Sequence, residues 1–401
     1  MRIPTAQMYR ATTATINEKQ LDLARLQNQL STGKRSANLA DDPAAAAGAS
    51  VLRSNLAVAS QFVQNRQIAQ QRLSFAENTL GAINDNLQTV RTQLIAAGNG
   101  ALSDSDRATI AEQLRQQLAT LVGLANSSDG QGGYLFGGYR EDTQPFVQNG
   151  AAVTYVSDDG TRLINVSSTR TIETGFNGAD VFARIPNGNG VFTTAANASN
   201  TGTGIIDSGR ITNAALLTPN NYEIRFQGSG STSTYDVWDT TTNTAVSTGT
   251  PFIAPASIAL PGISINVTGS PANGDRFSVL PSRNQDVFNT IREAITVLET
   301  PTYGFATPVA NGLRASLANL DQALIHISNQ RGAAGSRLNE LDQVAALGSA
   351  RDVDLKGTLS KLEDIDYVET LSNFTATQTG LQAALSSYAK ISQMSLFDYL
   401  R

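Results

Sequence analysis

The chain has 401 residues, enough for two or three domains with buried cores. Its charged fraction is 16% and its formal net charge is −5, which excludes a general electrostatic footprint for nucleic acid. Cysteine is absent, so disulfides, thiolate metal sites and thiol catalysis are excluded. No apolar run approaches the roughly 18 residues of a membrane span, and no apolar signal core opens the sequence. We therefore expect no membrane partner and, if the protein is exported, no cleaved signal.

The first thirty residues carry an apolar residue at every seventh position. These residues are Tyr9, Ile16, Leu23 and Leu30. The pattern predicts a helix with a narrow apolar stripe, which would remain exposed to water unless a partner helix covered it. Gly33 can end this helix, and the run Asp41-Asp42-Pro43 has the composition of a cap and first turn.

From residue 44 to residue 97, a spacing of threes and fours runs without a slip, and its positions are apolar except for Asn55 and Arg66. The pattern predicts one helix of roughly 80 Å at 1.5 Å per residue, a length that favours a coiled coil or bundle over a compact domain. A second, shorter helix begins near Ser103 and is expected to fold back on the first. The glycine-rich segment 129–139 has no phosphate-loop motif, and we interpret it as a short strand held close to a helix.

Between residues 140 and 283 the apolar period changes to two, which predicts an inserted β domain. We expect residues 153–155 and 163–166 to form a hairpin and Trp238 to be a core residue. Aspartates in this region could supply the paired carboxylates of an enzyme, but loop aspartates are usually solvated turn residues. We therefore assign no catalytic residue. The aspartates concerned are Asp158, Asp159, Asp180, Asp236 and Asp239.

Helical periodicity returns at residue 285, and a second long apolar seam over 313–345 is the expected antiparallel partner of 44–97. Arg66 and Arg331 occupy seam positions, where polar side chains can fix helix register at some cost in stability. We therefore expect each to have a carboxylate or backbone acceptor. His326, the single histidine, is interpreted as a partly exposed helix residue, because one histidine builds neither a histidine metal cluster nor a sound nucleophile triad. No metal or cofactor is predicted.

The last thirty residues carry another apolar stripe, interrupted by Gln378. Its members are Leu371, Phe374, Leu381, Leu385 and Tyr388. This narrow stripe also requires a partner helix, so we predict that the two chain ends pair as a helical stalk. The alternative is that both are ordinary amphipathic helices of a globular core.

Several motifs resemble the flagellin superfamily. The string LQNQLSTGKR at 26–35, followed by ADDPA at 40–44, looks like that family's N-terminal pattern, and AINDNLQTVR at 82–91 is similar to its next helix. The strings RGAAGSRL at 331–338 and LEDIDYV at 362–368 match segments near its C-terminal end. The opening MRIPT, the string YLFGG at 134–138 and the tail SLFDYL are similar to the hook–filament junction branch of the superfamily. Pro4 departs from that branch's pattern at a position before the helix that tolerates proline.

The resemblance implies a structural subunit of the bacterial flagellum, not an enzyme. It implies a ring that connects the hook, through a proximal hook-associated junction protein, to the flagellin filament. It also implies type III export without a cleaved signal and an export chaperone on the C-terminal helix. Filament flagellin, or a stalked surface adhesin or glycan-binding protein, remains an alternative.

The expected fold is mainly α with an inserted β domain, in the layered flagellin arrangement. Residues 1–43 with 352–401 would form a terminal coiled coil lining the tube, 44–139 with 284–351 a helical bundle, and 140–283 an outer β domain. The seam residues are expected to form the assembly interface. They are Tyr9, Ile16, Leu23, Leu30, Leu371, Phe374, Leu381, Leu385, Tyr388 and Leu396.

Overall fold

The structure, a computed structural model, describes residues 5–35, 42–130, 132–150, 152–228, 230–302 and 306–397, without the side chains of residues 5, 6, 231 and 391–397. Helices α1 (Thr5–Thr32), α2 (Pro43–Ala97) and α3 (Asp104–Ala125) precede a β-rich region. Helices α4 (Val287–Glu299), α5 (Thr307–Glu363) and α6 (Tyr367–Phe397) follow it. The predicted fold class, helical with an inserted β region, is confirmed. The chain divides into two compact units, Met1–Gln64 with Val344–Arg401 (unit 1) and Asn65–Gln343 (unit 2).

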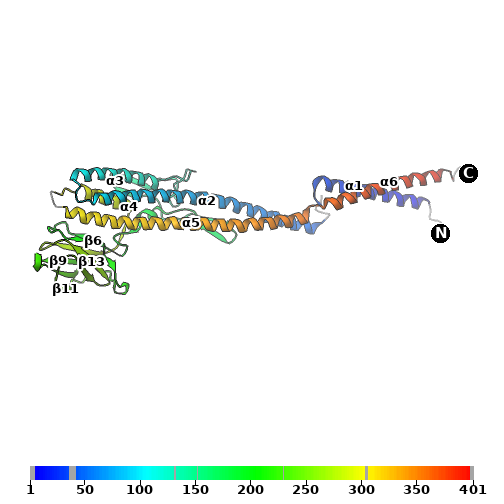
Figure 1. Ribbon diagram of the computed structural model, residues 1–401. Coiled ribbons are helices and arrows are strands. Elements are labelled where there is room, and N and C mark those ends of the chain that lie inside the picture. The colour runs from blue at the N-terminus through cyan, green and yellow to red at the C-terminus, as the bar shows by residue number, and fades with distance from the viewer. Residues whose placement is uncertain are drawn as a thin grey trace. The chain divides into compact units, whose positions relative to one another are not determined.

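In unit 1, α1 and α6 lie side by side and antiparallel (Figure 1). The Tyr9 ring meets the Tyr388 ring edge-on, with 5.9 Å between centroids, and Lys34 pairs with Asp364 near the opposite ends of the two helices. The predicted pairing of the two chain ends is therefore present in the structure.

In unit 2, α2 and α5 run antiparallel, because residue numbers fall along α5 as they rise along α2 in successive contacts. These contacts are Arg331 Nε to Glu77 Oε1 at 2.7 Å, Asn84 Nδ2 to Ser328 Oγ at 3.0 Å and Arg91 Nε to Asp321 Oδ1 at 2.7 Å. Each helix buries an apolar residue at every seventh position, as expected for a coiled-coil seam. These residues are Leu73, Leu80, Leu87 and Leu94 on α2, and Leu313, Leu320, Ile327, Ala334 and Leu341 on α5.

A segment of short hairpins follows α3, and its pairing differs from the predicted one. Strand β1 (Phe146–Asn149) pairs with β2 (Ala152–Tyr155), and β3 (Leu163–Ser167) pairs with β4 (Arg170–Glu173). The predicted hairpin between 153–155 and 163–166 is therefore wrong. The chain between them turns elsewhere, because the Asp158 carboxylate accepts hydrogen bonds from the backbone N–H groups of Tyr139 (2.9 Å) and Gly160 (2.7 Å).

The glycine-rich segment 129–139 forms turns with isolated bridges, so the expected short strand is also wrong. Its Phe136 enters an aromatic cluster with Phe146 and Phe182, and the Phe182 ring stacks on Phe288 of α4 at 5.7 Å. Gly178 permits this close packing, because a Cβ there would lie 2.7 Å from the Phe136 carbonyl oxygen. Residues 146–182 thus pack with the helices. Phe136 and Phe146, on either side of the predicted boundary at residue 140, belong to the same aromatic cluster.

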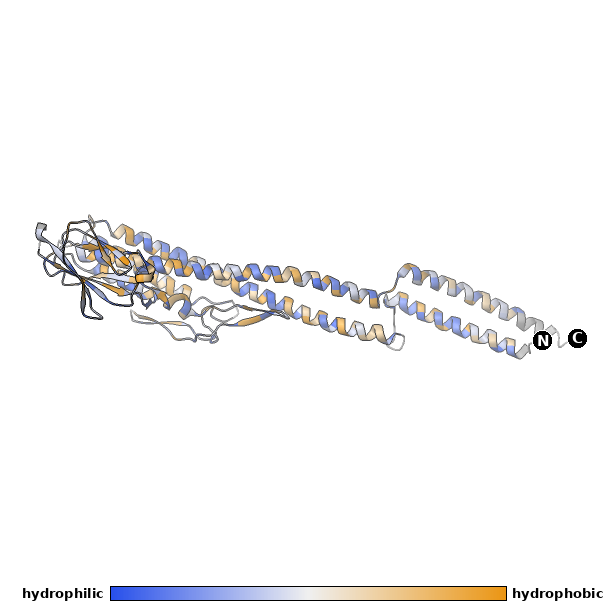
Figure 2. Cartoon of the chain, turned by 90° about the horizontal axis from the view of Figure 1, so that it is seen from below, coloured by the Kyte–Doolittle hydropathy of each residue, from blue (hydrophilic) through white to orange (hydrophobic). Residues whose placement is uncertain are grey.

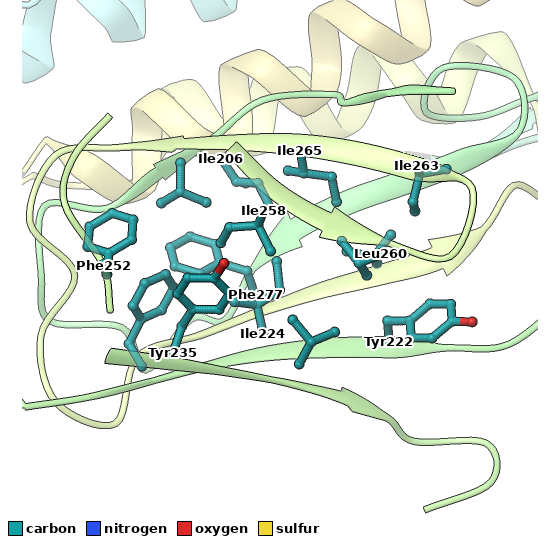
Figure 3. Packing of buried hydrophobic residues seen from close by; sticks show 14 of the residues in the cluster. Ile206, Tyr222, Ile224, Tyr235, Phe252, Ile258, Leu260, Ile263, Ile265 and Phe277 are labelled. Atoms are coloured by element: carbon teal, nitrogen blue, oxygen red, sulfur yellow. The ribbon is translucent and has the colours of Figure 1, made fainter. Parts of the chain in front are cut away.

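The remaining β residues form a two-sheet sandwich (Figure 3). One sheet has the order β11-β10-β9-β14-β6, and the other has the order β12-β13-β7, with β8 also paired to β13. The strands are β6 (Phe192–Ala196), β7 (Ile205–Ile206), β8 (Arg210–Ile211), β9 (Tyr222–Gln227), β10 (Thr234–Asp239), β11 (Thr244–Pro251), β12 (Ala256–Leu260), β13 (Ile263–Thr268) and β14 (Arg276–Pro281). The short strand β15 (Asn284–Gln285) pairs with β5 (Ile185–Pro186), next to η1 (Ala179–Ala183).

The core of the sandwich lies between the facing sheets, where Ile265 and Ile258 oppose Ile224 and Phe277 (Figure 3). Trp238 lies outside this core, which corrects the prediction. Alternation along β10 directs Val237 inward and Trp238 to the other face, where the Arg225 guanidinium lies 4.9 Å from its ring centroid.

The β region is attached to α5 by hydrogen bonds of two asparagine side chains, of which Asn311 is buried. The Asn311 side chain accepts a hydrogen bond from Ile206 N and donates one to Gly204 O, both at 3.0 Å. Asn319 Oδ1 accepts a hydrogen bond from Gly188 N at 2.7 Å. Because these bonds join backbone groups of the β region to one helix face, they fix where the sandwich sits on α5.

Candidate assembly surface

The paired helices α1 and α6 bury a narrow seam. On α1 the heptad positions are covered as predicted: Ile16 is 9% exposed, and Tyr9, Leu23 and Leu30 are half-buried. On α6, Phe374 and Leu381 are half-buried. The sequence pattern therefore identified the covered face of α1.

The covered face of α6 differs from the prediction by one residue. Leu371 and Leu385 are 55% and 45% exposed, so they are less covered than the prediction of a seam position requires. The covered positions are Thr370, Phe374, Thr377, Leu381 and Ala384. Small side chains at three of them let the helices approach closely, and the bulkier leucines of the neighbouring stripe remain outside. The Leu396 side chain lies outside the described residues.

Unit 1 has little core and much exposed apolar surface. In its described residues, the buried apolar side chains are Ile16 and Ala49, whereas unit 2 buries whole seams and a sandwich core. Large apolar side chains are exposed on all four helices of unit 1, and Figure 2 shows hydrophobic and hydrophilic residues interspersed along them. They are Met8, Leu21, Val51, Val58, Val63, Leu347, Val353, Tyr367, Val368, Leu371, Leu385 and Tyr388. Exposed apolar surface of this extent is typical of a protein-binding site.

Both seam arginines have acceptors, as predicted. Arg66 is 9% exposed, and its Nη1 donates a hydrogen bond to Val166 O at 3.0 Å. Burial lowers the pKa of Arg66 below its ordinary value, because desolvation disfavours the charged form. Arg331 has a side chain that is 50% exposed and pairs with Glu77. A role of these two residues in helix register stays a prediction.

A buried charged cluster escaped the sequence reasoning. The Arg72 side chain is 8% exposed and pairs with Glu141 and, at 3.5 Å, with Asp129. Arg162 Nη2 lies 3.0 Å from the second oxygen of Glu141. The cluster anchors the glycine-rich segment to α2. No local pattern marks these residues, because their partners are distant in sequence.

The aspartates considered for catalysis hold loops instead. Backbone hydrogen bonds, first from Tyr139 and then from Gly160, hold the pKa of the Asp158 carboxyl below its usual range. The Thr242 N–H does the same for the pKa of Asp239. Asp236 accepts a hydrogen bond from Gly249 N at 2.6 Å, and Asp159 pairs with Arg184 at 2.7 Å. Arg184 also pairs with Asp180, whose carbonyl oxygen contacts His326 Nε2 at 2.6 Å.

The described residues contain neither a metal-ligand cluster nor a membrane-spanning helix. No group of three or more histidines and carboxylates in them is placed to hold a metal ion. None of the helices, over their described lengths, is apolar enough to cross a bilayer.

Family comparisons match both helical ends and the sandwich. Residues 3–141 match the bacterial flagellin N-terminal helical region, and residues 317–400 match the C-terminal one. Residues 195–281 match the D2-like domain of flagellar hook-associated protein 1. Taken with the paired terminal helices, these matches define a flagellin-type structural protein of the bacterial flagellum.

Individual relatives narrow the class. Flagellar hook-associated protein 3 of Salmonella typhimurium is 29% identical over 404 residues and 100% of both chains. The crystal structure of hook-associated protein 3 from Legionella pneumophila is 30% identical, covers 78% of this chain and 98% of that chain, and has a TM-score of 0.74. A crystal structure of the flagellar junction protein from the same organism is 28% identical over 79% of this chain and 100% of that chain, with a TM-score of 0.71. The chain belongs to the hook-associated protein 3 family.

Proposed function

We propose that the protein forms the junction between hook and filament, as a closed ring of identical subunits. A proximal hook-associated protein would bind on the hook side and flagellin on the other. The observation that carries this proposal is the exposed apolar surface of unit 1, which the described chain does not cover. Such a surface gains free energy when neighbouring subunits remove it from water. Similarity to the flagellar junction protein of Legionella pneumophila supports this placement.

The layered arrangement is part of the proposal. Residues 1–43 with 352–401 would line the tube, and 44–139 with 284–351 would form the bundle around them. We draw the outer domain more narrowly than 140–283, because residues 146–182 pack with the helices through Phe146 and Phe182. The separable outer part is then the sandwich, about residues 192–281.

Export adds a second requirement. A chain that leaves the cell without a cleaved signal must keep its apolar surface covered before assembly. Leu371 and Leu385 on α6 are exposed by 55% and 45%, so an export chaperone would bind this helix and release it at the growing end.

The junction role can be tested in a strain that lacks its own copy of the gene. We expect electron microscopy of that strain to show hooks without filaments, and the intact chain to restore filaments. Immunogold labelling should place the restored protein in a short band between hook and filament. Filaments on the deletion strain, or label along the whole filament, would contradict the proposal; the second outcome would indicate a filament subunit.

A further inference from the structure

Two sequence motifs that lie 330 residues apart meet in unit 1. The segment STGKR (31–35) contains the last two residues of α1 and the three that follow, and LEDIDYV (362–368) joins α5 to α6. Their backbones pair as a short antiparallel bridge, because Arg35 N donates to Glu363 O at 2.6 Å and Ile365 N donates to Gly33 O at 3.1 Å. The end of α1 is thereby tied to the start of α6.

Opposite charges complete this contact. Lys34 Nζ lies 2.7 Å from Asp364 Oδ1 and 3.0 Å from Glu363 Oε2, and Arg53 Nη2 lies 2.6 Å from the other oxygen of Glu363. Hydrogen bonds with Asp364 and Glu363 raise the pKa of Lys34, and the bond from Lys34 lowers the pKa of Asp364. The pair is therefore charged across the whole neutral range.

Glycine at position 33 is needed for the close approach. Its φ of +69° lies in the left-handed region that favours glycine. A Cβ at this position would also lie 2.8 Å from the Tyr367 hydroxyl oxygen. The Tyr367 hydroxyl group thus lies close to Gly33, and a side chain at position 33 would displace it.

The α1–α6 seam by itself specifies its register weakly. The two helices advance by nearly equal numbers of residues between the Lys34–Asp364 contact and the Tyr9–Tyr388 contact. Between these ends, the covered positions repeat every seven residues and include side chains such as Thr12, Thr377 and Ala384. A slip by one heptad, about 10 Å at 1.5 Å per residue, would again bring covered positions face to face.

We propose that the motif latch, Gly33–Arg35 with Glu363–Tyr367 and Arg53, sets the register of the terminal helix pair. Lys34 and Asp364 are its main positioning residues. Exposed ion pairs contribute little stability, but oppositely charged partners favour one alignment over its competitors. A slip would displace Leu21 of α1 along the axis relative to Leu371 and Leu385 of α6. The latch therefore determines the arrangement of apolar side chains that a neighbouring subunit would meet.

The absence of cysteine permits a direct test with introduced pairs in the full-length monomer. Ile16→Cys with Leu381→Cys reports the observed register, because these two positions lie at the same level of the antiparallel pair. Ile16→Cys with Phe374→Cys, or with Tyr388→Cys, reports a slip of one heptad in either direction. A disulfide requires Cα atoms within about 7 Å. Because a slip of one heptad moves the helices about 10 Å along each other, each cysteine pair can cross-link in one register only.

With the native latch, we expect the Ile16–Leu381 pair to cross-link and the two slipped pairs to fail. Adding Lys34→Met with Asp364→Asn should raise the slipped cross-links at least several-fold at the expense of the native one. Salt of about 1 M, where the Debye length is about 3 Å, should have the same effect on the native latch. Lys34→Arg should preserve the native pattern.

The matched control is Lys356→Met with Asp352→Asn, which removes another lysine–aspartate pair (2.6 Å) within α5. It should leave the cross-links unchanged. Three results would overturn the inference: no Ile16–Leu381 cross-link with the native latch, an unchanged pattern in the latch variant, or loss of the Ile16–Leu381 cross-link in that variant without a gain in either slipped one. Because the readout is the isolated chain, it is independent of the junction role.

Discussion

Substitutions on α6 can separate folding of the chain from its assembly. Leu385 is 45% exposed, whereas Leu381 is half-buried in the seam with α1. We expect Leu385→Asp to lower the stability of the monomer by only about 1 kcal/mol and to abolish junction assembly. Leu381→Asp should impair both, because its carboxylate would face the seam.

The magnitudes follow from exposure. Full burial of a leucine side chain contributes about 1.5–3 kcal/mol, so Leu385, with 45% of its surface exposed, can gain roughly 1 kcal/mol more from a neighbouring subunit. Leu385→Ala should therefore weaken each contact by about 1 kcal/mol, somewhat less than tenfold. An aspartate buried without a partner costs several kcal/mol, whereas Leu385→Asp removes from the monomer only the covered half of one leucine, about 1 kcal/mol.

The assay combines melting of the purified chain, followed by circular dichroism, with filament counts in the complemented deletion strain. Gln382→Asp is the control, because it adds the same charge at an exposed polar position of α6. Normal filament counts with Leu385→Asp would refute the assignment of this face to assembly. A melting temperature lowered as much as by Leu381→Asp would refute the assignment of Leu385 to the exposed stripe.

Three further predictions address unit 2. Replacing residues 192–281 with a two-residue linker should leave the helices folded, because Ser282 N donates to Val191 O at 2.9 Å and the cut ends are adjacent. Deleting 140–283 should destabilise them by several kcal/mol, about the cost of losing a buried phenylalanine, and equal melting of the two deletions would contradict the narrower boundary. Arg66→Met should lower the free energy of urea unfolding by about 1–3 kcal/mol, since the Val166 carbonyl loses its donor. Arg331→Met should lower it by less than about 1 kcal/mol, because its ion pair is exposed. Equal losses for the two variants would contradict the argument from burial. Burial raises the pKa of Asp286, so its stabilising contribution is present below the unfolded pKa of about 3.9 and is lost as pH rises through the folded pKa. Asp286→Asn should therefore flatten the dependence of the unfolding free energy on pH between these two pKa values. An unchanged pH dependence would refute this assignment.

Residues with a regular local period were predicted well. The heptad of α1 is at least half-buried, and the α2 and α5 seams contain most of the buried apolar residues of these helices, from Ala69 to Ala97 and from Leu313 to Leu341. The period of two in the insert also corresponds to strands, from Tyr222 on β9 to Phe277 on β14. Helical and strand periods are local properties of the chain, so the order of residues is sufficient to reveal them.

The α6 stripe shows where a local period becomes ambiguous. Stepping by threes and fours from Leu371 passes through Phe374 and Leu381, and so does the covered stripe from Thr370. The two stripes lie side by side on one helix, and hydrophobicity favoured the leucines. In the structure α1 packs against the stripe with the smaller side chains, Thr370, Thr377 and Ala384. Leu371 and Leu385 therefore remain exposed and available to another protein chain.

The order of residues alone predicted that long helices with apolar seams lie toward both chain ends and that a β region is inserted between them. It also excluded thiol chemistry and disulfides, because cysteine is absent. Tertiary structure decided which strands pair, that Trp238 lies outside the sandwich core, and that Lys34 meets Asp364. A local pattern records which face of an element avoids water. Which element of the chain packs against that face depends on side chains that can lie hundreds of residues away in the sequence. Such contacts form only in the folded structure, so a local pattern does not reveal them.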